Sequence, residues 1–168
     1  MSRLVHQFKF QHSLTAGKVL STWFIDKKQH SNVALPKLLI PIPITSTRIA
    51  SRHYNQAAVL AKAIGNAWQI CCENSWAVRK GKTTQHHLTK ADRLTNAKAV
   101  FALSNRCLDN HITVWGETMR VAIVDDVVTT GVTVDVLAGL LKARYPSIVV
   151  EVWAMTFTPP PKSSLINE

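Results

Sequence analysis

Hydrophobic residues recur along the chain at spacings typical of helices and of strands. Repeats of three and four residues predict helices over residues 13–26, 57–68 and 133–144. Short apolar runs predict strands over residues 37–42, 99–103, 120–126 and 148–155, with one or two more inside residues 69–80. The alternation of strands and helices predicts an α/β fold, in which a mostly parallel sheet carries helices on both faces.

The first predicted helix begins at Ser13, a residue type that favours the N-cap position. Its apolar repeat consists of Ala16, Val19, Leu20, Trp23 and Phe24. Residues 45–56 and 81–98 are polar and lack a regular repeat, so we expect loops there, and loops as long as the second are often functional. We expect a single domain over residues 1–157, followed by a flexible proline-rich tail over residues 158–168.

Charge is distributed unevenly along the chain. Residues 1–100 contain 15 Lys and Arg against 3 acidic residues, whereas residues 101–168 contain 5 against 7. A basic region of this kind suggests an anionic partner, such as a nucleic acid, a phosphorylated small molecule or a membrane surface. A basic surface that only aids solubility would have the same composition, so charge alone does not separate these alternatives.

The N-terminus and the cysteines bear on location and on metal binding. The first ten residues lack the apolar segment of a signal peptide, and no apolar run approaches the ~18 residues of a membrane span, so we expect a cytoplasmic protein. Cys71, Cys72 and Cys107 have no spacing typical of metal ligands. We therefore expect reduced thiols and no zinc site.

The strongest predicted strand ends in two acidic residues, which a Thr-Thr-Gly turn and a helix start follow. Gly131 lets the backbone approach a ligand closely, and the unpaired amides of a helix N-terminus bind phosphate. Asp125 and Asp126 would repel a phosphate, but they can accept hydrogen bonds from two vicinal hydroxyls. A phosphate beside a diol describes a ribose 5-phosphate. The alternative is that one of these acids merely caps the following helix.

This stretch closely resembles the signature by which type I phosphoribosyltransferases bind 5-phosphoribosyl-1-pyrophosphate (PRPP). The resemblance implies that Asp125 and Asp126 hold the ribose hydroxyls at the reaction centre. It also implies a loop that cradles the 5-phosphate, formed by Val128, Thr129, Thr130, Gly131, Val132 and Thr133. Mg²⁺ accompanies PRPP in that family, and we expect it to arrive with PRPP rather than through direct protein ligands.

Two further blocks resemble the competence protein ComF family, also called the ComF/GntX family. The first block, residues 38–65, carries Pro41, Pro43, Arg48, Arg52, Tyr54, Asn55 and Gln56. The second carries Arg79, Thr83 or Thr84, Gln85, Leu88, Arg93, Asn96 and Phe101. The segment FKFQHS also resembles a lysine-containing segment that precedes these blocks in the family. The match extends from about residue 5 to residue 157 and implies a type I phosphoribosyltransferase-like fold.

The chain departs from the ComF pattern in two places. His53 occupies the position where the family usually has glycine, before the aromatic residue. The amino-terminal four-cysteine zinc module of the family is absent, which fits either a short-form homologue or a truncation. Any role that this module performs is therefore not implied for this chain.

By position in the fold, the resemblance assigns two loops to the pyrophosphate of PRPP. The first contains Arg48, Arg52 and Asn55, and the alternative for its arginines is ordinary exposure to solvent. The second spans residues 79–98, in which Arg79, Lys82 and Arg93 would lie near the leaving group when the loop closes. The alternatives here are an ordinary basic loop or one that binds nucleic acid.

The resemblance implies a Mg²⁺-dependent phosphoribosyl (pentosyl) transfer with release of pyrophosphate, and a role in natural transformation and DNA uptake. The sequence does not identify an acceptor. Two alternatives remain: a non-catalytic PRPP sensor, or an accessory protein that handles single-stranded DNA beside a helicase and a DNA-protection protein. A homodimer is compatible with the sequence, and a membrane span is not expected.

Overall fold

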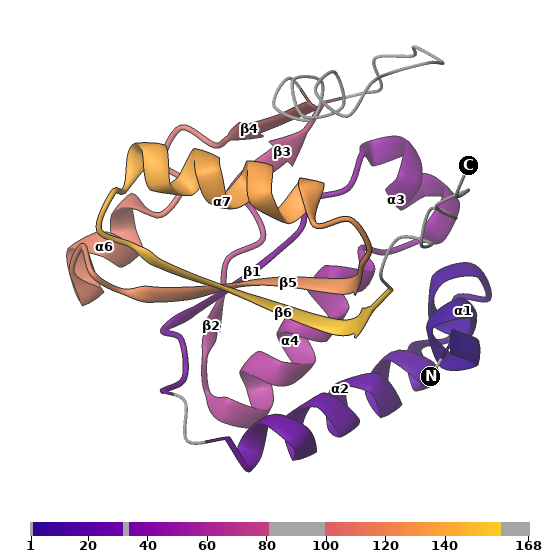
Figure 1. Cartoon of the computed structure of the whole chain (residues 1–168). Coiled ribbons are helices and arrows are strands. Elements are labelled where there is room, and N and C mark those ends of the chain that lie inside the picture. The colour runs from indigo at the N-terminus through magenta and orange to yellow at the C-terminus, as the bar shows by residue number, and fades with distance from the viewer. Residues whose placement is uncertain (1, 32–33, 81–99, 159–168) are drawn as a thin grey trace, which may run out of the picture.

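A four-stranded parallel sheet forms the centre of the structure (Figure 1), a computed structural model that describes residues 2–31, 34–80 and 100–158. The strands lie in the order β2-β1-β5-β6, and every neighbouring pair is parallel. Their bounds are Leu38–Pro41 for β1, Cys71–Cys72 for β2, Arg120–Val128 for β5 and Val149–Phe157 for β6. A separate antiparallel pair consists of β3 (Ala77–Arg79) and β4 (Phe101–Leu103).

Helices cover both faces of the sheet, which confirms the predicted α/β fold class. On one side lie α1 (Ser2–Phe10), α2 (Leu14–Gln29) and α4 (Gln56–Trp68), and on the other lie α6 (Asp109–Trp115) and α7 (Val132–Arg144) with the β3–β4 pair (Figure 1). A short helix, α3 (Ser46–Arg52), follows β1 near the end of the sheet that also carries α1.

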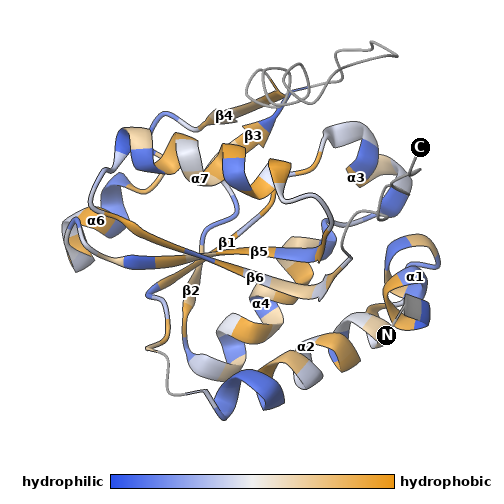
Figure 2. Ribbon diagram, in the orientation of Figure 1, coloured by the Kyte–Doolittle hydropathy of each residue, from blue (hydrophilic) through white to orange (hydrophobic). Residues whose placement is uncertain are grey.

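The alternation of side chains along the strands divides the core into two clusters. Leu38, Ile40, Val121 and Ile123 pack with α7 and β3 on one face, whereas Leu39, Ala122 and Val124 pack with α2 and α4 on the other. Figure 2 shows the central strands mainly in hydrophobic colours, with a hydrophilic break near the end of β5. Because both faces are covered, these strands are almost continuously apolar, as in other parallel sheets.

Helices α1 and α2 meet at a close contact that depends on a glycine. A methyl group at Gly17 would lie 2.5 Å from the ring of Phe8, which is fully buried. The hydroxyl of Tyr54 donates to the carbonyl of Phe8 at 2.8 Å. Together these contacts fasten α1 to α2 and to the start of α4, so α1 has a defined place beside the end of β5.

Most predicted elements form within a few residues of the expected bounds, and three helices of the described residues were not predicted. The expected loop over residues 45–56 contains α3, and neither α1 nor α6 was anticipated. In α2, Ala16 and Leu20 are buried as the repeat implies. Val19 and Trp23 were expected in the core but are 47% and 42% exposed, because α2 turns its Ala16–Leu20 side toward α4.

None of the helices in the described part of the chain combines the length and the apolar character that crossing a bilayer requires. The predicted tail falls almost entirely on residues 159–168, which lie outside the described residues.

Candidate functional site

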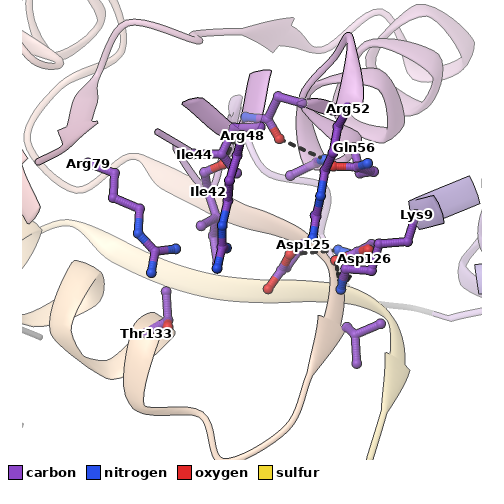
Figure 3. A pocket seen from close by; sticks show the side chains of 13 residues that line it. Lys9, Ile42, Ile44, Arg48, Arg52, Gln56, Arg79, Asp125, Asp126 and Thr133 are labelled. Carbon is purple, nitrogen blue, oxygen red and sulfur yellow. Dashed lines mark hydrogen bonds and ion pairs between the residues drawn. The ribbon is translucent and has the colours of Figure 1, made fainter. Parts of the chain in front are cut away.

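A pocket of about 160 Å³ opens where β1 and β5 end, at the carboxyl edge of the sheet (Figure 3). Ligands bind at this edge in open α/β sheets. The pocket is lined by Lys9, Ile42, Ile44, Arg48, Arg52, Asn55, Gln56, Ala57, Arg79, Asp125, Asp126, Val127 and Thr133. Its polar wall therefore combines two carboxylates with four basic side chains, which come from α1, α3 and β3.

The two acids differ in their surroundings because they are neighbours on one strand. Asp126 follows Ala122 and Val124 in the alternation of β5, and it is only 4% exposed. The Nζ atom of Lys9 lies 3.2 Å from Oδ1 and 3.0 Å from Oδ2 of Asp126, although only the contact with Oδ1 has hydrogen-bond geometry. Asp126 is thus a buried carboxylate with one basic partner, which comes from a helix 117 residues away in sequence.

Asp125 lies next to this buried charge. Its Oδ1 atom accepts a hydrogen bond of 2.8 Å from the backbone amide of Asp126. Burial raises the pKa of Asp125 to about 7, and the negative charge of Asp126 contributes in the same direction. Near neutral pH Asp125 is therefore about half protonated, and a cation or a hydrogen-bond donor in the pocket would favour its ionised form.

The basic residues converge on the pocket from separate elements. Burial lowers the pKa of Arg79, and the neighbouring charge of Arg48 lowers it further, whereas Asp125 opposes the change. The guanidinium of Arg79 lies 5.2 Å from the ring centroid of Phe101, and that of Arg52 lies 5.7 Å from the centroid of Phe10. Because the charge of Arg79 is disfavoured by burial and by the neighbouring Arg48, an anion bound beside Arg79 would stabilise it.

A smaller hollow of about 50 Å³ adjoins the pocket at the start of α7. It is lined by Asp125, Val127, Val128, Thr129, Thr130, Gly131, Val132, Thr133 and Val134. Gly131 is the N-cap of α7, with φ at 77°, a conformation that glycine adopts without the usual strain. No side chain caps this helix, which leaves the amides of its first turn to a ligand. Neither aspartate caps α7, so that alternative reading of the acidic pair is wrong.

The structure brings most of the predicted site residues together. The pocket contains Arg48, Arg52, Asn55, Arg79, Asp125, Asp126 and Thr133, and the adjoining hollow contains Val128, Thr129, Thr130, Gly131 and Val132. Lys82 and Arg93 lie outside the described residues, so their predicted places near the leaving group are neither supported nor opposed.

Asn55 lines the pocket, but its side chain also holds the fold. Its Oδ1 atom accepts from the amide of Ala57 at 3.0 Å and so caps α4. Its Nδ2 atom donates to the carbonyl of Ile42 at 2.9 Å, which ties α4 to the end of β1. Asn55 therefore positions its neighbours, and the structure gives its amide two partners within the protein.

Lys9 and Gln56 line the pocket and were not among the predicted site residues. The resemblance of the segment FKFQHS to a lysine-containing family segment was the available signal for Lys9, and Gln56 belongs to the family block that was recognised without a role for it.

The described residues do not bring three or more His, Cys, Asp or Glu side chains together in an arrangement suited to a metal ion. In the pocket, the donors that a divalent cation would prefer are the oxygens of Asp125 and Asp126, including the Oδ2 atom of Asp126 that lacks a hydrogen bond. Two carboxylates would hold Mg²⁺ only in combination with oxygens of a bound ligand.

Comparison with known proteins gives several relatives that match most of this chain and about two thirds of their own length. The chain is 31% identical over 164 residues to the DNA utilization protein YhgH of Salmonella typhi, covering 94% of this chain and 67% of that protein. It is 32% identical over 160 residues to competence protein F of Haemophilus influenzae, covering 92% and 67%. It is 32% identical over 164 residues to YhgH of Escherichia coli K12, again covering 94% and 67%.

A solved structure, the adenine phosphoribosyltransferase of Leishmania tarentolae, aligns with a TM-score of 0.48 and 14% identity. The alignment covers 85% of this chain and 58% of that one. A scan of protein-family models found no match.

Proposed function

The chain belongs to the competence protein F (ComF) family, and from that premise we propose that it binds PRPP with Mg²⁺ and transfers its phosphoribosyl group with release of pyrophosphate. The names of its relatives support a role in DNA uptake or DNA utilization. The chain spans about two thirds of those relatives, so the proposal concerns the part of the family protein that contains the pocket.

One observation carries the proposal: the pocket combines a carboxylate pair with a group of basic side chains, and the adjoining hollow adds an uncapped helix N-terminus. PRPP carries a vicinal diol between a 5-phosphate and a pyrophosphate. The acids suit the diol, the first turn of α7 suits the 5-phosphate, and Arg48, Arg52 and Arg79 suit the pyrophosphate. An anion alone would not need Asp125 and Asp126, and a neutral sugar would not need the arginines.

The residues of the chain would act mainly by positioning. Asp125 and Asp126 accept hydrogen bonds from the ribose hydroxyls and fix the ring, while the amides of α7 fix the 5-phosphate. Arg48 and Arg79 donate to the pyrophosphate oxygens, where negative charge increases as the bond to the anomeric carbon breaks. Mg²⁺, when bound with PRPP, would neutralise part of that charge.

Calorimetric titration with PRPP and Mg²⁺ tests the binding step. Replacing both acids (Asp125→Asn with Asp126→Asn) removes two charged hydrogen bonds, each contributing about 1.5–3 kcal/mol, so the affinity should fall at least about 100-fold. Glu117→Gln is the control, because Glu117 is an exposed acid outside the pocket. A folded double variant that binds PRPP as tightly as the wild type would refute the assignment of the acids.

A second measurement decides between catalysis and sensing. Wild-type protein is mixed with PRPP, Mg²⁺ and a panel of nucleobases and nucleic acids, and pyrophosphate is measured. Release that depends on one acceptor identifies an enzyme and its substrate. Tight PRPP binding without release under any acceptor supports the alternative, a PRPP sensor.

The excess of basic residues favours a second candidate function. The 15 Lys and Arg in residues 1–100 exceed what one PRPP molecule needs, and they suit a polyanion such as single-stranded DNA. Fluorescence anisotropy with a 30-mer at low and at physiological salt tests this candidate. Binding that weakens steeply with salt supports direct handling of DNA, whereas no binding at low salt would assign that task to partner proteins.

A further inference from the structure

The side-chain amide of Gln56 is buried at the wall of the pocket without a hydrogen-bond partner. Gln56 is 3% exposed, and its Nε2 atom makes no hydrogen bond within the described residues. The same holds for the Oδ2 atom of Asp126, and in the described part of the chain these are the two buried side-chain atoms of this kind. An unsatisfied buried amide costs about 1–3 kcal/mol, so Nε2 of Gln56 calls for an explanation, whereas Oδ2 of Asp126 still has the ion-pair contact of 3.0 Å with Nζ of Lys9.

The fold fixes Gln56 in this place. Gln56 is the first residue of α4, and the preceding Asn55 both caps that helix and binds the carbonyl of Ile42 at the end of β1. Helix α4 packs on the face of the sheet formed by Ala122 and Val124, which is the face that Asp126 continues. In the view of Figure 3, Gln56 lies with Lys9 and Asp126 toward one end of the pocket, away from Arg79 and Thr133.

The two unsatisfied atoms are chemically complementary to a hydroxyl group. Nε2 of Gln56 is a donor, and Oδ2 of Asp126 is an acceptor. An ionised phosphate offers only acceptors, so it would satisfy Gln56 and be repelled by Asp126. A sugar hydroxyl accepts one hydrogen bond and donates another, and a vicinal diol does so twice.

We propose that Gln56 determines sugar specificity, donating a hydrogen bond to a ribose hydroxyl while Asp126 accepts one from the diol. This inference rests on the proposed PRPP site and adds to it a neutral residue that distinguishes ribose from deoxyribose. Among the described residues, Nε2 of Gln56 and Oδ2 of Asp126 make no hydrogen bond, and the correct sugar supplies one to each. A ligand that lacks one hydroxyl leaves a buried polar group without a partner and binds more weakly.

The first test needs no variant. Wild-type protein is titrated with ribose 5-phosphate and with 2-deoxyribose 5-phosphate, and the proposal expects the ribose compound to bind at least about 10-fold more tightly. Equal affinities would overturn the proposal while leaving the phosphate site intact. If neither these compounds nor PRPP binds, the proposed function itself fails.

The second test uses Gln56→Met, which keeps the length of the side chain and removes the amide. PRPP affinity should fall about 10-fold and the preference for ribose 5-phosphate should fall toward one, while the melting temperature of the free protein should stay or rise, because a buried unsatisfied donor is gone. Gln56→Glu, which replaces the donor by an acceptor, should weaken PRPP binding at least as much. Gln29→Met, at the exposed end of α2, is the matched control.

A merely structural role for Gln56 predicts the opposite pattern. In that case Gln56→Met lowers the melting temperature and leaves the ribose preference unchanged, which overturns the proposal. A fall in PRPP affinity with an unchanged ribose preference would place Gln56 against the phosphates and would overturn its assignment to the hydroxyl.

Discussion

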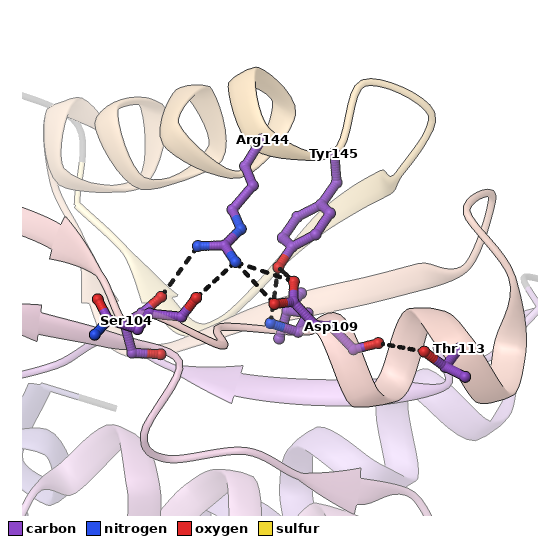
Figure 4. Close-up of polar contacts among 7 residues, drawn as sticks. Ser104, Asp109, Thr113, Arg144 and Tyr145 are labelled. Carbon is purple, nitrogen blue, oxygen red and sulfur yellow. Dashed lines mark hydrogen bonds and ion pairs between the residues drawn. The ribbon is translucent and has the colours of Figure 1, made fainter.

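Two groups of polar side chains, one around Asp109 and one around Asp126, lie toward opposite ends of the sheet, and their hydrogen bonding differs. At the α6 end, Asp109 accepts from Arg144 Nη2 at 2.9 and 3.1 Å and from the hydroxyl of Tyr145, and Arg144 also donates to the carbonyls of Ser104 and Asn105 (Figure 4). At the pocket, Lys9 is the single basic partner that the described residues offer Asp126, and one of its oxygens lacks a hydrogen bond there.

This difference suits the Asp109 cluster to stabilising the fold and the pocket to binding a ligand. The Asp109 cluster uses its polar groups to join α6 to the end of α7, because Tyr145 also accepts from the amide of Leu108 at 3.1 Å. The pocket leaves donors and acceptors available, which costs stability in the free protein and favours a ligand that supplies the missing partners. Two predictions test this contrast and a third tests the backbone at the end of α3, beginning with the largest effect.

The largest effect should be a pH dependence of stability that comes from Asp125. Its folded pKa of about 7 exceeds the value of about 3.9 for an unfolded chain, so the folded protein binds more protons between about pH 4 and 7. The free energy of unfolding should therefore decrease as the pH rises through this window, by on the order of 3 kcal/mol. Urea unfolding at several pH values measures it.

Asp125→Asn should flatten this slope and stabilise the free protein near pH 7, because the neutral amide avoids the repulsion from Asp126. The difference between wild type and variant isolates Asp125 from the histidines that titrate in the same range. Parallel slopes for the two proteins would show that Asp125 has an ordinary pKa.

The second prediction concerns the Asp109 cluster, whose polar groups are hydrogen-bonded within the protein. Asp109→Ala leaves the Tyr145 hydroxyl and one side of Arg144 without their acceptor, and should lower the free energy of unfolding by about 2 kcal/mol. The side chains of Asp109 and Arg144 are 45% and 34% exposed, so a fully buried ion pair would lose more. PRPP affinity should not change, because Asp109 lies outside the pocket.

Thermal unfolding of Asp109→Ala checks the loss of stability, and PRPP titration checks the unchanged affinity. Glu117→Ala is the control for removing an exposed acid nearby. A variant that loses PRPP affinity while remaining folded would contradict the separation of the two clusters.

The smallest effect should come from His53, which ends α3 with φ at 64°. This left-handed conformation costs a non-glycine residue about 1–2 kcal/mol, part of which the greater freedom of glycine in the unfolded chain offsets. His53→Gly should therefore raise the free energy of unfolding by about 0.5 kcal/mol. The control is His30→Gly, at an exposed position with φ at −86°, which should lower the free energy of unfolding. Equal changes in both variants would refute backbone strain at His53.

The sequence was sufficient to predict features that depend on neighbouring residues. The apolar run before Asp125 identified the central strand, and the turn at Gly131 identified the start of α7. The position of His53 also has a local explanation, since the glycine usual in the family suits a left-handed residue.

Features that depend on distant residues could not be predicted. Lys9 meets Asp126 only because α1 packs on Tyr54 and α2, and no local pattern reports that contact. The unsatisfied amide of Gln56 becomes evident only once its surroundings are known. Helix α3 has seven residues and none is buried, so its sequence lacks an apolar repeat. The Thr45 side chain, which accepts from the amide of Arg48, caps this helix and helps to hold it.

The pairing of β1 with β5 has a consequence for the synthesis of the chain. The two strands are separated by about 80 residues, so at about 5–20 residues per second a ribosome delivers β5 some 4–16 s after β1. During that interval one edge of an apolar strand has no partner and is open to pairing with other nascent chains. Pro36, Pro41 and Pro43 flank or end this strand and lack the amide hydrogen that such pairing requires. We therefore expect the prolines around β1 to limit aggregation before the pocket exists.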